Sequence, residues 1–112
     1  MKLITAIIKR ERLEDVARAV TSTGARGMTV TEVRGFGQQY GHLAEVRPKE
    51  RPFLMLPKVR VDVVVRDADA RSVTEAIAEA ARSGALGDGK IWASAVDSVL
   101  RVRTGEHDSD AL

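Results

Sequence analysis

The sequence predicts an α+β domain of the ferredoxin-like class, in which two βαβ units form four antiparallel strands with both helices on one face. Three observations support this class. The chain has 112 residues, the size of one domain. Its hydrophobic period changes from two to 3.6 and back to two within the first third. The second half then repeats the same order after a long aperiodic stretch.

The first βαβ unit is predicted over residues 2–34. Lys2–Lys9 is rich in isoleucine and alternates as a strand does. Apolar residues three or four positions apart then form a helical stripe: Leu13, Val16, Ala17 and Val20. Gly24 is placed to end this helix. Residues 28–34 alternate again and predict the second strand.

The second unit begins with a strand whose valines all point to one side: Val59, Val61, Val63 and Val65. A second helical stripe follows: Val73, Ala76, Ile77, Ala80 and Ala81. Gly84 is expected where this helix ends. Residues 91–102 are apolar enough for a last strand, with a break near residues 97–98.

Two features exceed a minimal sandwich of this class. Residues 38–56 show no clear period, whereas connections in compact domains usually run about 4–6 residues, so this stretch predicts a functional loop. Val64 is apolar on the face opposite to the other valines. When helices cover only one side of a sheet, the other face must be covered in another way, and oligomerisation is the simplest.

Composition excludes several functions. The net charge is +2 and aromatic residues make up 4%, so we expect neither a basic patch nor a base-stacking platform for nucleic acid. Without cysteine there is no disulfide or thiolate metal site. The apolar run after Met1 is too short for a signal peptide or a membrane span. The absence of cysteine fits a reducing cytosol, so we expect a cytoplasmic protein. No pairing of a nucleophile with a base is recognisable, so we expect a protein that is not an enzyme and has no catalytic residues.

The stretch "SGALGDGKIW" at residues 83–92 has nearly the spacing of a nucleotide-binding P-loop. It is not one, because Ile91 stands where magnesium needs Ser or Thr. The predicted helix also precedes the glycines, so no helix N-terminus faces a phosphate. Two interpretations remain: a helix cap followed by a turn, or an anion-binding loop made of glycine amides and Lys90.

Arg101 and Arg103 favour the second interpretation. One residue separates them in a strand-like run, so both are expected on one face, near Lys90. Like charges repel unless an anion lies between them, and arginine matches phosphate geometry. The alternative, a solvated pair at an edge, stays open on the residues alone.

The motifs "MTVTEVRGFG", "LPKV", "GDGKIW" and "RVRTGE", in this order, resemble the PII family of nitrogen-regulatory signal-transduction proteins. The resemblance covers the whole chain, residues 1–112, as a single domain. It implies a ferredoxin-like homotrimer that binds ATP or ADP in clefts between subunits.

The resemblance also implies individual roles. Arg101 and Arg103 would reach the phosphates from the adjacent subunit, opposite a B-loop at residues 82–90. Gln39 would hold magnesium together with ATP, and Gln39 and Lys58 would bind 2-oxoglutarate. The complete set of implied nucleotide-binding residues is Thr29, Gly37, Gln38, Val64, Gly87, Asp88, Gly89, Lys90, Arg101 and Arg103.

Residues 37–55 correspond to the T-loop, by which the family docks on targets such as an ammonium channel, a biosynthetic enzyme or a transcription regulator. The docking residues implied here are Arg47, Lys49 and Arg51. Arg51 replaces the tyrosine that relatives modify, which predicts no tyrosine nucleotidylylation. The altered loop leaves an alternative open: a divergent regulator that senses adenylates with another small anion, such as bicarbonate, and controls a transporter or carbon metabolism. Residues 104–112 are expected to be a flexible acidic tail.

Overall fold

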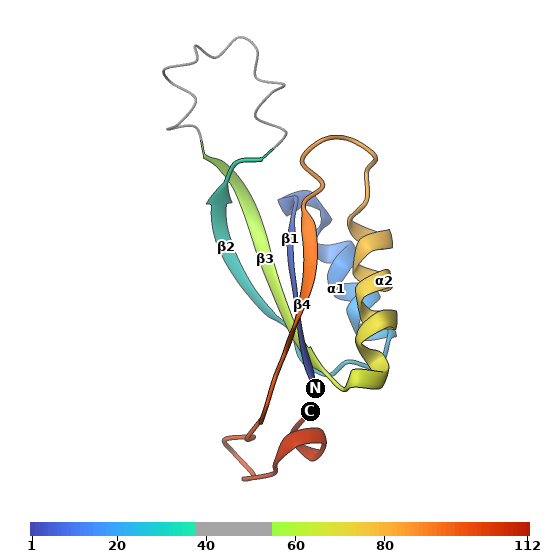
Figure 1. Cartoon of the computed structure of the whole chain (residues 1–112). Helices are drawn as coiled ribbons and strands as arrows, with labels where there is room; N and C mark the ends of the chain where they lie inside the picture. Colours follow the sequence, from blue (N-terminus) through green and yellow to red (C-terminus); the bar gives the residue numbers. More distant parts are fainter. Residues whose placement is uncertain (38–54) are drawn as a thin grey trace.

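The computed structural model describes residues 1–37 and 55–112 (Figure 1). It contains four strands and two α-helices: β1 Lys2–Ile8, α1 Leu13–Ser22, β2 Thr29–Gly35, β3 Leu56–Val65, α2 Ala70–Ala81 and β4 Lys90–Ala95. Three short 3-10 helices accompany them: η1 Arg10–Arg12, η4 Asp67–Asp69 and η5 Asp108–Ala111. This order is the predicted repeat of two βαβ units.

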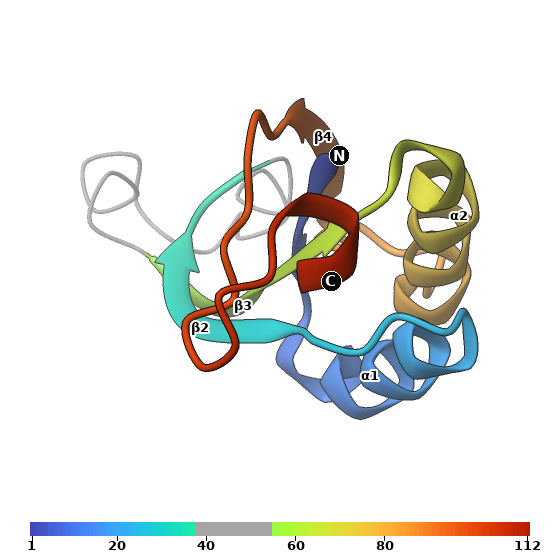
Figure 2. The same ribbon diagram turned by 90° about the horizontal axis from the view of Figure 1, so that it is seen from below.

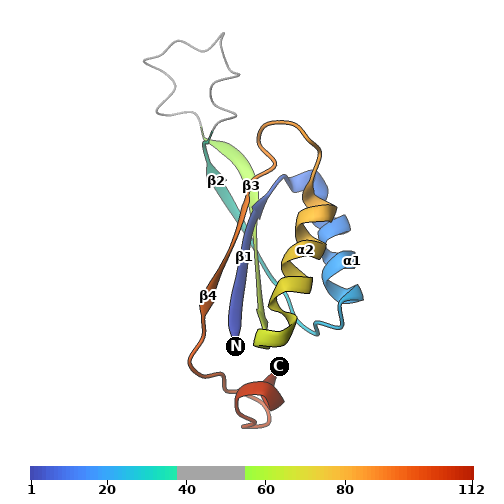
Figure 3. The same cartoon turned by 45° about the vertical axis from the view of Figure 1, so that its right-hand side comes forward.

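The strands form one antiparallel sheet in the order β2-β3-β1-β4. In the register of the two central strands, Ile4 lies opposite Val63. Figures 2 and 3 show α1 and α2 side by side on one face of this sheet. The ferredoxin-like class predicted from the sequence is therefore confirmed.

The hydrophobic core lies between the helices and the sheet. The alternating valines of β3 supply one layer, because every second side chain of a strand points to the same face. Val16 and Val20 of α1, with Val73 and Ile77 of α2, pack onto this layer and are almost completely buried. The predicted helical stripes thus face the core. The core holds the strands in place, and the ends of these strands position the site.

The opposite face of the sheet carries a polar group at its centre. Thr5 is fully buried and donates a hydrogen bond of 2.7 Å to Asp62, which also forms a salt bridge of 2.9 Å with Arg60. Burial opposes ionisation of this carboxyl, but the hydrogen bonds from Arg60 and Thr5 lower the pKa of Asp62. Apolar groups flank it: Trp92 is 46% exposed and Val64 is 37% exposed.

The last predicted strand is shorter than expected. β4 ends at Ala95, and further on only Leu100 forms an isolated bridge, with His107. The prediction that Arg101 and Arg103 share a strand face is therefore wrong. The amide of Gly105 donates to the carbonyl of Arg101 at 2.8 Å, and this turn reverses the chain.

Two further expectations are corrected. Helix α2 ends at Ala81, and Arg82 is already extended, so Gly84 does not cap it. Gly24, by contrast, directly follows the C-cap of α1 with φ 93°, as predicted. Residues 104–112, expected to be a flexible tail, are folded here into a turn and the helix η5. Its hydrogen bonds include the amide of Asp108 to the carbonyl of Val99 at 2.8 Å.

Candidate functional site

The loop between α2 and β4 packs directly on the backbone of β1. We call residues 82–90 the B-loop. It lies at the end of the sheet where β2 ends and β3 begins (Figure 1). Gly87 and Gly89 have φ of 93° and 96°, a region that L side chains rarely adopt. A Cβ at Gly89 would lie 1.6 Å from the carbonyl oxygen of Ile7, so only glycine fits there.

A single carboxylate holds the B-loop together. The backbone amides of Ser83 and Gly84 donate to Oδ2 of Asp88 at 2.8 and 2.9 Å. The Ser83 hydroxyl donates to Oδ1, and the Lys9 ammonium lies 3.2 Å from the same oxygen. These hydrogen bonds, with that of the Ser83 hydroxyl the strongest, hold the pKa of Asp88 well below its usual range. Asp88 is therefore ionised at neutral pH.

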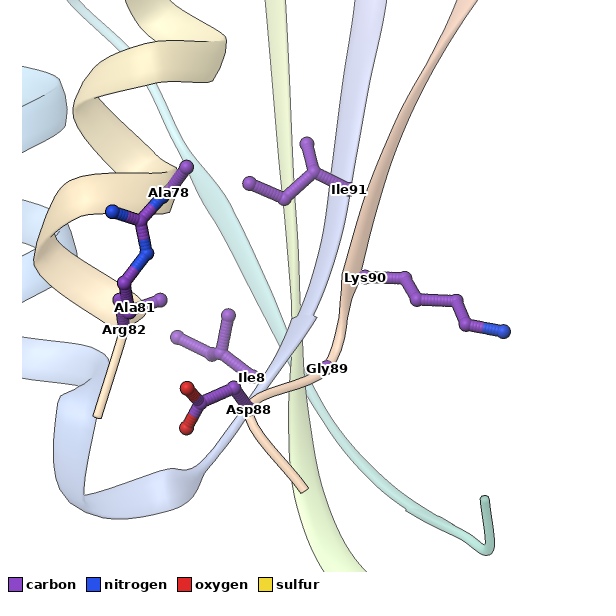
Figure 4. Close-up of a pocket in the computed structure, with 8 residues that line it drawn as sticks. All are labelled: Ile8, Ala78, Ala81, Arg82, Asp88, Gly89, Lys90 and Ile91. Carbon is purple, nitrogen blue, oxygen red and sulfur yellow. The ribbon is translucent and has the colours of Figure 1, made fainter. Parts of the chain in front are cut away.

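Asp88 and Lys90 point to opposite sides of the B-loop. In Figure 4 the Asp88 carboxylate is directed toward the α2 side, where Ala81 and Arg82 lie, and the Lys90 side chain extends away from it. The small cavity on the α2 side has a volume of ≈ 170 Å³. The negative charge of the loop and its terminal cation are thus separated by the backbone.

A larger pocket of ≈ 410 Å³ opens on the side of the sheet end. Residues from β1, from the end of β2 and just after it, from β3, from the B-loop and from β4 line it, among them Ile7, Gly37, Lys58, Gly87, Lys90 and Trp92. Two lysines, glycine backbone and an aromatic ring therefore converge on one space. This combination is suited to an anion that also carries an apolar part.

Lys58 donates a hydrogen bond of 2.8 Å to the carbonyl oxygen of Gly87 and so links β3 to the B-loop. Burial, followed by the nearby charge of Lys9, lowers the pKa of Lys58. An ammonium in such an environment gains from a nearby anion, because an opposite charge favours its ionised form. The arrangement favours a carboxylate or phosphate ligand at this position.

A second pocket, of ≈ 750 Å³, lies at the opposite end of the sheet. Val64 and Arg101 line it, together with residues of the C-terminal segment. The guanidinium of Arg101 donates to Oε1 of Glu106 at 3.0 Å and to the backbone oxygen of Leu112 at 3.1 Å. The C-terminal segment therefore fixes Arg101 beside this pocket.

The structure divides the residues predicted to bind nucleotide or 2-oxoglutarate between the two ends of the sheet. Lys58 and Val64 are six positions apart on β3, a separation of about 20 Å at the usual rise of a strand. The first group comprises Gly37, Lys58 and residues 87–90, and the second comprises Thr29, Val64 and Arg101. Arg103 is exposed in the turn and is not among the residues that line the second pocket. Lys90 and Arg101 therefore do not meet within one chain, contrary to the sequence argument.

Several predicted residues lie outside the described part of the chain: Gln38, Gln39, Arg47, Lys49 and Arg51. Across residues 1–37 and 55–112, no three His, Cys, Asp or Glu side chains are grouped so as to hold a metal ion. Over the same ranges, no helix combines the length and the apolar character needed to cross a membrane.

Sequence reasoning missed Lys9 and Ser83. Lys9 follows β1, 79 positions before Asp88, and no local pattern links the two residues. Ser83 stands five positions before Asp88, where a serine at the start of a glycine-rich loop is an ordinary turn residue. Only the packing of the loop against the end of β1 reveals their common partner.

Comparison with known proteins gives concordant results. A family model described as "Nitrogen regulatory protein P-II" matches residues 1–106. The nitrogen regulatory protein GlnK of Escherichia coli (strain K12) is 47% identical over 112 residues, 100% of both chains. The nitrogen regulatory protein P-II of Rhizobium meliloti (strain 1021) is 49% identical over 112 residues, again 100% of both. The crystal structure of Arabidopsis thaliana PII bound to citrate has a TM-score of 0.82 and 36% identity, covering 99% of this chain and 91% of that one.

Proposed function

Because the chain belongs to the nitrogen regulatory protein P-II family, we propose that it acts as a homotrimeric signal-transduction regulator that binds ATP or ADP between its subunits. The resemblance drawn from its sequence motifs is thereby confirmed at the level of the family. The regulator controls target proteins of nitrogen metabolism by docking rather than by catalysis.

One observation carries this proposal: the cations suited to phosphate lie at two ends of the sheet in each chain. Lys58 and Lys90 line the pocket at the B-loop, and Arg101 lines the pocket at the opposite end. A polyanion that needs all of them requires the B-loop of one copy and the Arg101 end of another. A site divided in this way supports an assembly of several copies.

The uncovered face of the sheet supports the same assembly. Trp92 and Val64 are large apolar residues on that face and remain 46% and 37% exposed in the single chain. In the sheet register Trp92 lies opposite Thr5, and Val64 is two positions from Asp62 on β3, so both apolar residues adjoin the Thr5–Asp62 hydrogen bond. Neighbouring copies that pack on this face bury the apolar groups, while the polar group at its centre is already satisfied.

The second effector in this proposal is 2-oxoglutarate, with Lys58 as the partner of one carboxylate. Lys58 already donates to the Gly87 carbonyl, so a carboxylate that takes this donor acts on the B-loop at the same time. Gln39, which lies outside the described residues, would complete the site and hold magnesium with ATP. The lysines and glycine amides of the described pocket suit the phosphates themselves rather than a metal ion.

Target docking is assigned to the T-loop at residues 37–55, with Arg47, Lys49 and Arg51 as contacts. Arg51 has no hydroxyl to modify, so the ligands alone set the state of the loop in this proposal. The protein acts in the cytoplasm and reaches a membrane transporter only as a peripheral partner. A mass increase of one uridylyl or adenylyl group on the native protein would contradict the unmodified state.

Titration calorimetry tests the function directly. We expect saturable binding of ATP and of ADP, and heat from 2-oxoglutarate only when MgATP is present. Light scattering on the same sample should give the mass of a trimer. Absence of binding by any adenine nucleotide overturns the proposal, whereas heat from bicarbonate and none from 2-oxoglutarate selects the alternative regulator.

A further inference from the structure

We infer that Asp88 is a positioning residue for the nucleotide site: its carboxylate closes the B-loop from behind, together with Lys9 and Ser83, so that the glycine amides and Lys90 face the ligand. We call Lys9, Ser83, Gly84 and Asp88 the clamp. This inference rests on the proposed nucleotide function. It assigns roles to Lys9 and Ser83, which lie outside the set of nucleotide-binding residues predicted above.

The clamp joins parts of the chain that otherwise only approach each other. Two amides at the start of the B-loop, from Ser83 and Gly84, reach the carboxylate near its end at 2.8 and 2.9 Å. Lys9, which follows β1, reaches the same carboxylate at 3.2 Å and donates to the Ser83 hydroxyl oxygen at 3.0 Å. One carboxylate therefore ties the start of the loop to its end and ties the loop to the end of the central strand β1.

The side chain is placed behind the loop rather than in front of it. Figure 4 shows the Asp88 carboxylate directed toward α2 and the Lys90 side chain extending to the other side. The four donors around Asp88 occupy both of its oxygens, so the carboxylate has little capacity for a ligand. Its contribution is to hold the backbone at Gly87 and Gly89 in one conformation with positive φ, because glycine by itself has many others open to it.

Two interpretations of Asp88 predict opposite effects on affinity. If the carboxylate were only a negative charge near bound phosphates, its neutralisation would strengthen nucleotide binding. If the carboxylate positions the loop, its loss would weaken binding. The B-loop would then be ordered only when the nucleotide binds, and the entropy lost in ordering it would reduce the affinity. The sign of the change therefore separates the two.

The experiment measures ADP affinity by calorimetry for Asp88→Asn, Asp88→Ala and Ser83→Ala, with Glu79→Gln as the control. Glu79 is exposed near the C-terminal end of α2, so the control removes the same charge at the same end of the molecule. We expect Asp88→Ala to weaken ADP binding about tenfold. Asp88→Asn keeps one oxygen acceptor and should lose less, and Ser83→Ala changes no charge and should also weaken binding. The control should stay within about twofold, the range of an exposed charge.

Hydrogen exchange supplies a readout that a general loss of stability would not reproduce. In Asp88→Ala the amides of Ser83 and Gly84 lose their acceptor and should exchange faster, while the amides of β1 and β3 keep the wild-type rate. Equal or tighter ADP binding by Asp88→Asn, with Ser83→Ala unchanged, would overturn the clamp while the proposed function stands. A wild-type protein that binds no nucleotide would overturn the proposed function, and the inference with it. If Asp88→Ala does not fold, the ADP affinity of Ser83→Ala alone decides whether the clamp positions the loop.

Discussion

Replacement of Gly89 by alanine tests how closely the B-loop packs on β1. The new methyl group would lie 1.6 Å from the carbonyl oxygen of Ile7 and 2.7 Å from its carbonyl carbon. Both are backbone atoms, so no side-chain rotation relieves the clash. A positive φ for a residue with a Cβ costs about 1–2 kcal/mol, and a forced backbone shift adds about 1–3 kcal/mol. The expected loss of unfolding free energy is therefore about 2–5 kcal/mol.

Gly84→Ala is the matched control, because Gly84 has φ 83° but nothing within 4 Å of its built Cβ. Only the backbone cost applies there, about 1–2 kcal/mol. For a chain of 112 residues we take a slope of about 4 °C per kcal/mol. Gly89→Ala should then lower Tm by about 8–20 °C and Gly84→Ala by about 4–8 °C, measured by thermal unfolding at one protein concentration. Equal shifts for the two variants, or full ADP binding by Gly89→Ala, would refute the packing argument.

Two further predictions concern charged groups of the site. Lys58→Met removes the ammonium proposed to bind a 2-oxoglutarate carboxylate, so no heat of 2-oxoglutarate binding should be detected in the presence of MgATP. It also removes the hydrogen bond to the Gly87 carbonyl, so ADP binding should fall only a few-fold. Undiminished 2-oxoglutarate binding would exclude Lys58 as its partner. The second prediction concerns pH. Because the pKa of Asp88 is lower in the folded than in the unfolded protein, its ionised carboxylate stabilises the fold at pH values above its unfolded-state pKa of about 3.9. This stabilisation is lost as the pH falls through the folded-state pKa. The Tm difference between wild type and Asp88→Asn should therefore be constant from about pH 7 to pH 5 and shrink below about pH 4; a difference that shrinks already between pH 7 and pH 5 would contradict the lowered pKa.

The elements that local periodicity controls could be predicted from the sequence. The valines of β3 and the stripes of α1 and α2 show their faces directly, because a side chain buried in a two-layer sandwich must recur at the period of its element. Gly24 could also be predicted, because a glycine that directly follows a helical stripe commonly ends the helix, and its φ of 93° agrees with this. The repeat of these signals was sufficient for the fold class.

The end of β4 shows where periodicity fails. Residues 96–102 are apolar enough for a strand, yet the amide of Arg101 pairs with the carbonyl of Glu106 at 2.9 Å and the chain turns back on itself. Gly105, with φ 72°, permits this reversal. A strand needs a neighbour as well as a pattern, and the sequence carries no information on which neighbour is available.

The candidate site was predictable in its residue types but not in its arrangement. The sequence predicts Lys90 and Arg101 as cations that share one polyanion, but the structure places them at opposite ends of one chain. The partners of Asp88 were not recognisable, because Lys9 is remote in sequence and meets it only through packing. Contacts made by tertiary structure leave no mark in local spacing.

The account depends most on a nucleotide site shared between two copies of the chain, and mixing two defective variants tests it. Lys90→Ala damages the B-loop half of each site, and Arg101→Ala with Arg103→Ala damages the other half. Each variant alone should bind ADP poorly. After the two are unfolded and refolded together, sites with an intact half from each chain should form, and calorimetry should detect wild-type affinity in a fraction of the sites. A mixture that binds no better than the separate variants would contradict the shared site.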